Sequence, residues 1–258
     1  MNSLPHYALL LLLACCPAAA DDWQRVVAGV EYRHLQRDGV DAHLVRVDLR
    51  MKSIEVVATA VAERGLTVSD FARGRQAVVA INGDYFDVQL NPIGLAMGDG
   101  AVWARADERV RRQEVVGVGP RRARIFARAE PLREPKRWMT GAVSGWPMVV
   151  EDCAPVAALP GSAHFTLAPH PRTAVGLSRD RRRLLLVVAD GRREGVAGLT
   201  LPELAALMVE AGACTALNLD GGGSSALWLR DRIVNRPSDG VERKVSNHLG
   251  VIEVGRKH

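Results

Sequence analysis

Residues 184–225 read LLLVVADGRREGVAGLTLPELAALMVEAGACTALNLDGGGSS, and the pattern in this stretch decides the fold class. A helix is predicted to begin at Thr200, because Glu203 completes a capping box and a proline stands in the first turn. Its apolar face recurs at helical spacing until Gly212, a residue type common at helix ends. The apolar runs on both sides are typical of strands buried on both faces. The stretch therefore predicts a β-α-β unit in the middle of a sheet.

Both strands of this unit end in an acid followed by glycine, at Asp190 and at Asp220. In open α/β sheets, ligands bind outside the carboxyl ends of the strands. A tight crossover between the two strands would bring both carboxylates to the same edge of the sheet. An Asp-Gly pair is also a common turn sequence, so a purely structural role for either acid stays open.

The five residues after Asp220 read GGGSS and are the next candidate site. Adjacent glycines lose much backbone freedom on folding, so their presence indicates a sharp bend or a close approach to the backbone. Successive amides can form an anion-binding nest, to which serine hydroxyls add donors. The nucleotide-binding P-loop pattern and the G-x-S-x-G elbow are both absent. The predicted binding residues here are Gly221, Gly222, Gly223, Ser224 and Ser225.

The rest of the chain is dominated by short segments with strand patterns, among them 43–49, 54–60 and 77–81. A short helix is predicted at 68–73, with Thr67 or Ser69 as its cap. The 258 residues are 48% hydrophobic and 24% charged, as in ordinary globular proteins. We therefore predict an α/β (mixed α+β) fold, with a single domain over 22–258 that contains a mixed β-sheet flanked by helices.

Residues 1–20 have the pattern of a secretory signal peptide, with a short apolar run before an A-x-A cleavage motif. A lipoprotein signal with Cys15 as the lipidated residue and a retained anchor are the alternatives. We expect a periplasmic or secreted protein, in contact with the membrane only if Cys15 is lipidated. Cys153 and Cys214 then remain, either as a disulfide or as free thiols.

The formal net charge is +5, and arginines gather between Arg105 and Arg137 together with several acids. A solvated hairpin or loop with local ion pairs is the simpler interpretation, and a site for a phosphate-rich ligand is the alternative. Nucleic acid is not expected as a partner, because neither stacking aromatics nor a helix-turn-helix or zinc-finger spacing accompanies the arginines.

Several further stretches share a polar, glycine-containing character: INGDYFD at 81–87, HPRTAVG at 170–176 and VSNHLG at 245–250. Together with GLTLPELAALMVEAGA, LNLDGGGSSAL, VNRPSDG and ERKVSNHLGV, these motifs resemble the phosphodiester glycosidases. The animal member of that family removes N-acetylglucosamine from phosphate to uncover mannose 6-phosphate on lysosomal enzymes. The resemblance covers about residues 40–254. It implies hydrolysis of a sugar-1-phosphodiester between the anomeric carbon and oxygen.

The resemblance also implies roles for individual residues. Asp220 is the first choice for the carboxylate that stabilises an oxocarbenium-like transition state, activates water or attacks the anomeric carbon, and Asp190 is the second. Arg172 offers a planar fork for phosphate. Asn82 and Asn247 would hold sugar hydroxyls or orient the acid. The remaining predicted substrate-binding residues are Gly83, Asp84 and Thr173.

No cofactor is predicted, although a structural divalent cation at Asp84, Asp87 and Asp99 stays open. His170 and His248 are alternatives for acid/base work. The expected function is that of an exported hydrolase of a sugar-phosphate diester or phosphorylated glycan. The rivals are a binding protein for phosphorylated glycans without catalysis and a metal-dependent phosphodiesterase that cuts the P–O bond.

Overall fold

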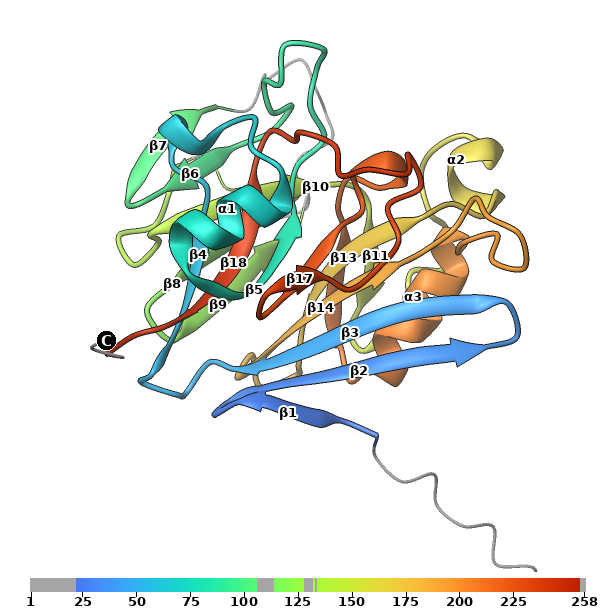
Figure 1. Ribbon diagram of the computed structural model, residues 1–258, viewed down its shortest axis with the longest axis horizontal. Coiled ribbons are helices and arrows are strands. Elements are labelled where there is room, and N and C mark those ends of the chain that lie inside the picture. Colours follow the sequence, from blue (N-terminus) through green and yellow to red (C-terminus); the bar gives the residue numbers. More distant parts are fainter. Residues whose placement is uncertain (1–21, 106–113, 128–131, 133, 256–258) are drawn as a thin grey trace, which may run out of the picture.

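The computed structural model describes residues 22–105, 114–127, 132 and 134–255, and within them the strands form three sheets (Figure 1). The largest is an eight-stranded sheet with the order β1 (Gln24–Val27), β2 (Val30–Arg37), β3 (Val40–Asp48), β14 (Arg183–Ala189), β13 (Arg172–Leu177), β15 (Thr215–Asn218), β11 (Met148–Glu151) and β12 (Ala154–Pro155).

Two five-stranded sheets complete the strand content of the described residues. The β10 sheet has the order β7 (Ala101–Ala104), β6 (Ala96–Gly98), β10 (Gly141–Gly145), β8 (Glu114–Gly119) and β9 (Arg122–Phe126). The β5 sheet has the order β17 (Arg232–Ile233), β16 (Leu227–Leu229), β5 (Ala77–Asn82), β18 (His248–Glu253) and β4 (Ile54–Ala58).

The helices are few and short: α1 (Val68–Arg75), α2 (Ala163–Leu167), α3 (Leu201–Glu210) and the 3₁₀ turns η1 (Val61–Glu63) and η2 (Gly222–Ser224). Thr67 caps α1 by accepting from the Asp70 amide, as one of the two predicted caps. The predicted capping box of α3 is confirmed, because Thr200 accepts from the Glu203 amide and Glu203 binds back to the Thr200 amide.

The predicted β-α-β unit is present, but with another strand inside it. Strands β14 and β15 both pair antiparallel with β13, so they run parallel to each other with β13 between them. Helix α3 makes the connection. The expectation that these strands are buried on both faces is confirmed, because alternate residues of β14 enter two different cores. Leu184, Leu186 and Val188 join the core shared with the β5 and β10 sheets, whereas Leu185, Val187 and Ala189 pack under α3.

The expected mixed sheet flanked by helices is wrong, because every strand pair of the described residues is antiparallel and one sheet covers another. Hairpin turns cause this arrangement. Asp38 and Gly39 both have positive φ, as do Asp99 and Gly100, and two such residues in a row join antiparallel neighbours directly. An Asp-Gly pair between two segments of strand pattern indicates a hairpin, and the sequence has such a pair at 38–39 and at 99–100.

Cys153 and Cys214 form a disulfide, which settles the alternatives that the sequence leaves open. The bond links the turn after β11 to the residue before β15, and these two strands are neighbours in the eight-stranded sheet. The signal-peptide and lipidation predictions for residues 1–20 and Cys15 lie outside the described residues. None of the described helices is both long enough and apolar enough to cross a membrane.

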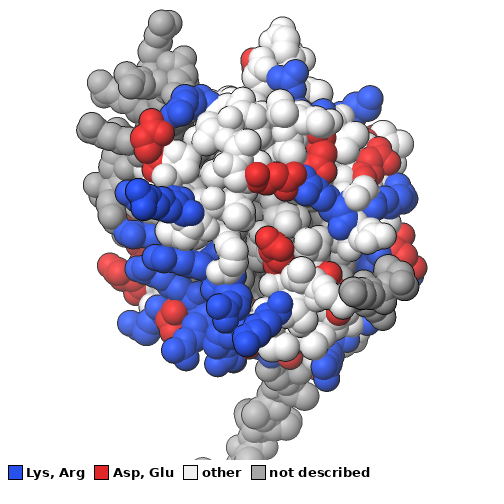
Figure 2. All heavy atoms as spheres, turned by 90° about the vertical axis from the view of Figure 1, so that its left-hand side faces the viewer, with Lys and Arg blue, Asp and Glu red and all other residues white. Residues whose placement is uncertain are grey.

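Basic side chains gather on the face of the molecule that lies on the left in Figure 1, with fewer acidic side chains among them (Figure 2). The β8–β9 hairpin lies on this side, within the arginine-rich segment of the sequence. Arg122 stacks over Trp138, and Arg105 pairs with Glu134 at 2.9 Å. The described part of this segment thus has the hairpin and local pairs of the simpler interpretation.

Candidate functional site

Strands β13, β14 and β15 bring Arg172, Asp190 and Asp220 to one edge of the eight-stranded sheet. Arg172 opens β13 opposite Ala189, the last residue of β14, and Asp190 follows directly. Strand β15 runs parallel to β14 and ends at Asn218, two residues before Asp220. The predicted position of the two acids at one edge is therefore confirmed.

Asp220 is the acid of this edge that remains partly exposed to solvent. Burial of its carboxyl group raises the pKa to about 6. Hydrogen bonds from the Ser224 hydroxyl and the Gly221 amide, together with the positive charge of Arg243, oppose that rise in pKa. Asp220 is consequently a carboxyl group that titrates close to neutral pH, as groups at catalytic sites often do.

Asp190 is held in a different environment. Its side chain is buried, and the carboxylate accepts from Asn235 Nδ2 at 3.0 Å and from the Arg236 amide at 3.0 Å. Arg193 lies 3.8 Å away. Burial still raises the pKa of Asp190. These contacts give Asp190 a positioning role for the turn at 235–236 and leave its carboxylate little room for a substrate.

Arg172 is likewise buried and turned toward the protein. Its Nε donates to the Leu199 carbonyl at 3.0 Å, and its Nη2 donates to the Phe165 carbonyl at 2.8 Å. Among the described residues no acceptor binds Nη1, which leaves one terminal nitrogen for a ligand. The predicted bidentate fork for phosphate is therefore not available in this conformation.

The triple glycine forms the tight turn η2, and two arginines flank it. Gly222 has a φ of +60°, and a Cβ there would lie 3.1 Å from both terminal nitrogens of Arg192. A Cβ at Gly223 would collide with Arg243 and with Asp239, the acid that Arg243 binds at 3.0 Å. Glycine at these positions thus lets two guanidinium groups approach the backbone of the turn.

The backbone amides of the turn are mostly used within the protein. The Gly222 amide donates to Pro171 at 2.9 Å, and the amides of Ser224 and Ser225 donate at 3.2 Å to Gly221 and Gly222. These amides are not free to form the predicted anion nest, because the contact with Pro171 uses one and 3₁₀ hydrogen bonds use the other two. The groups that favour an anion here are instead Arg192 and Arg243, which the sequence analysis did not select although each lies in a motif it quoted.

Asn82, Thr173 and Ser225 form a buried link between the sheets rather than an open binding surface. Asn82 Nδ2 donates to the Asp220 carbonyl at 2.6 Å, and its Oδ1 accepts from Thr173 at 2.8 Å. Thr173 also contacts the Ser225 hydroxyl at 3.2 Å. These predicted substrate-binding residues are near Asp220, and their contacts hold it in place.

Asp84 and Asn247 meet next to this link. The Asn247 Oδ1 accepts from the Asp84 amide at 2.7 Å, and the Asn247 carbonyl accepts from the Gly83 amide at 2.9 Å. Among the described residues Asp84 Oδ2 and Asn247 Nδ2 are buried without a hydrogen-bond partner. Burial raises the pKa of Asp84 well above its usual range, and the negative charge of Asp220 adds to the effect. The surroundings of Asp84 therefore favour its protonated form over the carboxylate.

Tyr85 is a further site residue that the sequence analysis missed, although it stands in the quoted INGDYFD motif. Its hydroxyl accepts from Asn218 Nδ2 at 2.6 Å and donates to the Trp146 carbonyl at 3.2 Å. Burial and the charge of Asp220 raise the pKa of Tyr85, whereas the positive charge of Arg172 lowers it. The Tyr85 hydroxyl is thus under the influence of both the acid and the arginine.

Other candidates fall outside this group. His248 is buried, stacks on Phe71 and binds Thr59, and burial lowers its pKa to about 3. His170 contacts Arg192 at 3.3 Å and stays close to the site. The three acids Asp84, Asp87 and Asp99 bind different partners, and within the described residues they form no cluster suited to a cation.

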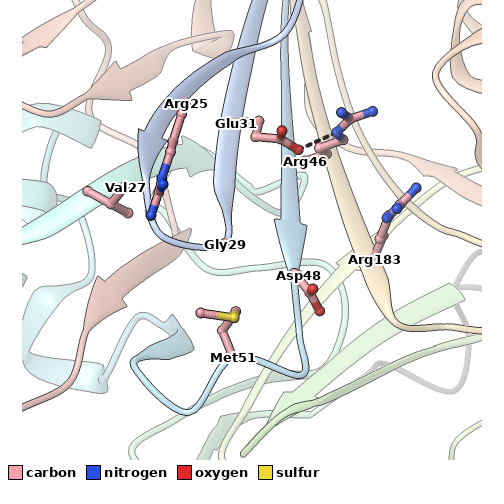
Figure 3. A pocket seen from close by; sticks show the side chains of 8 residues that line it. All are labelled: Arg25, Val27, Gly29, Glu31, Arg46, Asp48, Met51 and Arg183. Carbon is pink, nitrogen blue, oxygen red and sulfur yellow. Dashed lines mark hydrogen bonds and ion pairs between the residues drawn. The ribbon is translucent and has the colours of Figure 1, made fainter.

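A cavity of about 230 Å³ lies at the other end of the eight-stranded sheet (Figure 3). Asp48 and Arg183 pair there at the end of β3 and the start of β14, whereas Ala42 and Ala189 pair near the candidate site. The cavity is lined by Arg25, Val27, Gly29, Glu31, Arg46, Asp48, Met51 and Arg183. It is therefore separate from Asp220.

The sequence profile of the family described as phosphodiester glycosidase matches residues 75–252. The chain belongs to this family. It is 26% identical over 230 residues to the N-acetylglucosamine-1-phosphodiester alpha-N-acetylglucosaminidase of Mus musculus, a match that covers 80% of this chain and 43% of the mouse protein. A SPbeta prophage-derived uncharacterized protein of Bacillus subtilis is 27% identical over 191 residues, covering 72% of this chain and 29% of that protein. The chain thus spans less than half the length of either relative.

Solved structures share the fold of this chain. The catalytic domain of zebrafish N-acetylglucosamine-1-phosphodiester alpha-N-acetylglucosaminidase, auto-inhibited by its pro-peptide, aligns with a TM-score of 0.69 at 22% identity, over 87% of this chain and 82% of that chain. A hypothetical protein from Synechocystis aligns with a TM-score of 0.71 at 15% identity, over 88% and 62%.

Proposed function

We propose that this phosphodiester glycosidase is an exported hydrolase that cleaves the bond between the anomeric carbon and the phosphate oxygen of a sugar-1-phosphodiester. The observation that carries the proposal is the environment of Asp220. This partly exposed acid has a pKa raised to about 6 and lies beside a glycine turn flanked by Arg192 and Arg243. A carboxylate next to guanidinium groups suits a substrate with a developing cation on one side and a phosphate on the other.

In this proposal the arginines act on the phosphate side of the cleaved bond and Asp220 acts on the sugar side. A phosphodiester leaves with its own negative charge, so it needs cations to hold it more than it needs a strong acid. Arg192 and Arg243 are placed to bind that charge, and Nη1 of Arg172 is a third donor. Above pH 6 Asp220 is a carboxylate, which stabilises the oxocarbenium-like transition state, activates water or attacks the anomeric carbon.

Asp84 is the second carboxyl group in this proposal, in preference to Asp190. The charge of Asp220 acts on Asp84, whereas the charge of Asp41 acts on Asp190. In its protonated form Asp84 can donate a hydrogen bond from Oδ2, and Asn247 Nδ2 is a second buried donor beside it. Because both groups are buried, we propose that they set the environment of Asp220 and do not contact the sugar themselves.

The place of action that we propose is outside the cytoplasm, on an envelope or extracellular glycan. The disulfide between Cys153 and Cys214 supports this part, because such bonds persist in oxidising compartments. The apolar run in residues 1–20 supports it from the sequence.

The test is to incubate the purified protein with a panel of α- and β-linked sugar-1-phosphodiesters and to measure release of reducing sugar and of the phosphate monoester. Run in oxygen-18 water, C–O cleavage places the label on the sugar. Label on the phosphate, with activity lost in chelator, would instead indicate a metal-dependent phosphodiesterase.

The variant Asp220→Asn separates an enzyme from a pure binder. We expect the variant to lose turnover and to keep much of its affinity for the diester in calorimetry. If no member of the panel is turned over by the wild-type protein while a phosphorylated glycan binds equally to both proteins, the hydrolase proposal fails and a glycan-binding role takes its place.

A further inference from the structure

A second cluster of chemically active side chains lies on the β2–β3 hairpin, which is separated from β15 by β14 and β13 in the eight-stranded sheet. His34 and His43 face each other across the two strands, and Asp41 stands two residues before His43 on the same face. The Nε2 atoms of His34 and His43 lie 2.7 and 3.7 Å from one oxygen, Asp41 Oδ1. One ligand atom from each residue falls within 4.8 Å of the other two.

We propose that His34, Asp41 and His43 bind one divalent transition-metal ion of the zinc type, with water completing its coordination. Two imidazoles and a carboxylate are the ligands that zinc accepts, whereas calcium and magnesium prefer oxygen donors alone. The site is independent of the proposed hydrolysis.

Neighbouring groups already orient the ligands. The Tyr32 hydroxyl contacts Nδ1 of His43 at 2.7 Å, which directs Nε2 of that ring toward Asp41. Gln36 Nε2 donates to Asp41 Oδ2 at 3.1 Å, and Arg193 pairs with the same oxygen at 2.5 Å. Oδ1 is therefore the carboxylate oxygen that faces the histidines. Such outer contacts fix the ring orientation and tautomer of metal ligands.

The exposed side of the cluster lets a metal ion enter from solvent and lets a ligand side chain change its conformation. The rings of His34 and His43 stack with centroids 4.4 Å apart and planes 8° from parallel. A metal ion must lie near the plane of each ring that binds it, so one ring has to turn. His34 can do so because 39% of its side chain is exposed, and it lines an open cavity of about 450 Å³ with Asp22, Trp23 and Gln24.

The buried ring is ready for ligation. The ring of His43 is buried, and the contact of its Nδ1 with the Tyr32 hydroxyl leaves Nε2 as the nitrogen that can bind a metal ion. Arg193 offsets part of the charge of Asp41 and bridges to Asp190 at 3.8 Å. The Asp190 amide also donates to the Asp41 carbonyl at 2.9 Å. We therefore expect metal binding to stabilise the β2–β3 hairpin against this part of the sheet.

The experiment uses the whole protein without a histidine tag, freed of metal by EDTA and dialysed. Calorimetry with Zn²⁺ measures stoichiometry and affinity, and the visible spectrum with Co²⁺ reports the coordination geometry. We expect one ion per chain and a higher Tm in Zn²⁺. His34→Gln should weaken Zn²⁺ binding at least about tenfold.

His164→Gln is the matched control, because His164 is also exposed and its ring lies 5.2 Å from that of His170, the other histidine pair on the described surface. This variant should bind Zn²⁺ as the wild type does. The proposal is overturned if the wild type shows no saturable one-to-one binding, if His34→Gln binds equally well, or if His164→Gln removes the binding. X-ray absorption of the Zn²⁺-loaded wild type gives a check that needs no variant: two imidazole ligands are expected, and fewer would contradict the site.

Discussion

The backbone amide of Asp220 donates to the carbonyl oxygen of Gly83 at 3.0 Å, which joins the eight-stranded sheet to the β5 sheet at the candidate site. The Asp220 carbonyl in turn accepts from Asn82 at 2.6 Å. The main chain of Asp220 is thus held from both sides while its carboxyl group stays partly exposed. This fixed, desolvated position is what raises the pKa of the acid, and it leads to the first prediction.

Asp220→Asn should make the protein inactive and more stable at pH 7.5. The folded pKa of Asp220, about 6, is above the usual value near 4, so the folded state holds the proton more tightly than the unfolded state does. Stability from this group is complete at low pH and is lost as pH rises through 6. At pH 7.5 the variant should gain up to about 2–3 kcal/mol, and the gain should vanish below about pH 4.

Urea unfolding of both proteins between pH 4 and 8 measures this difference. Asp231→Asn, at an exposed acid of the β16–β17 turn, is the control and should change little. An Asp220→Asn variant that is less stable than wild type at every pH would contradict the raised pKa. In the wild type, kcat/KM should fall as the pH drops below about 6, because Asp220 acts as a carboxylate.

Burial raises the pKa of Asp190 as well, so the loss of its charge favours the asparagine variant, but we expect the loss of hydrogen-bond acceptors at Asp190 to outweigh this gain. Its two carboxylate oxygens accept from Asn235 and Arg236, and an asparagine offers one acceptor oxygen and turns an N–H group toward those donors. Asp190→Asn should lower the free energy of unfolding by about 1–3 kcal/mol at pH 7.5. Urea unfolding measures it. Activity should fall mainly through KM, because the turn at 235–236 moves, and a large loss of kcat with unchanged stability would indicate direct catalysis instead.

The strand ends could be predicted from the sequence because the patterns that determine them are local. The capping box at Thr200 and Glu203 fixes α3, and one crossover between two strands fixes the edge at which Asp190 and Asp220 leave the sheet. The presence of β13 between β14 and β15 could not be predicted, because no local pattern reports which strands become neighbours. The Asp-Gly turn at Asp38 was a local signal for antiparallel pairing that the analysis did not use.

The residue types at the site could be predicted, but the direction of each side chain could not. Arg172 is where the motif places it, yet its guanidinium turns to the carbonyls of Leu199 and Phe165. The arginines that reach the glycine turn come from 192 and 243, one after β14 and the other before β18. Side-chain direction depends on tertiary packing, which a single sequence does not encode locally.

Reduction of the disulfide between Cys153 and Cys214 should destabilise the protein. The bond closes a loop with a sequence separation of 61, and the chain-entropy model assigns such a loop about 4 kcal/mol. Thermal unfolding with and without a reductant should show a clear drop in Tm. Cys153→Ala with Cys214→Ala should reproduce the drop and should no longer respond to the reductant. An equal Tm in both conditions would mean that the bond does not form in solution.

The same Gly→Ala change should have opposite effects on the free energy of unfolding at two glycines. Gly98 lies buried in β6, and an added Cβ would overlap the backbone of Thr59 and Ala60, which cannot move without shifting β4 and η1. Gly98→Ala should therefore lower the free energy of unfolding by about 1–3 kcal/mol. Gly74 lies exposed in α1 with nothing within 4 Å of an added Cβ. Gly74→Ala should raise the free energy of unfolding by about 0.5–1 kcal/mol, because alanine loses less backbone entropy in a helix.

Urea unfolding of the two variants beside the wild type tests both glycine predictions in one experiment. The opposite signs matter, because a general intolerance of larger residues would lower stability in both variants, and a loosely packed β10 sheet would leave Gly98→Ala unchanged. The first outcome would contradict the prediction for Gly74, and the second would contradict the close contact between β6 and the segment after β4. That contact joins β6 of the β10 sheet to the segment after β4 of the β5 sheet, so a loss of stability confined to Gly98→Ala would support the packing of these two sheets against each other.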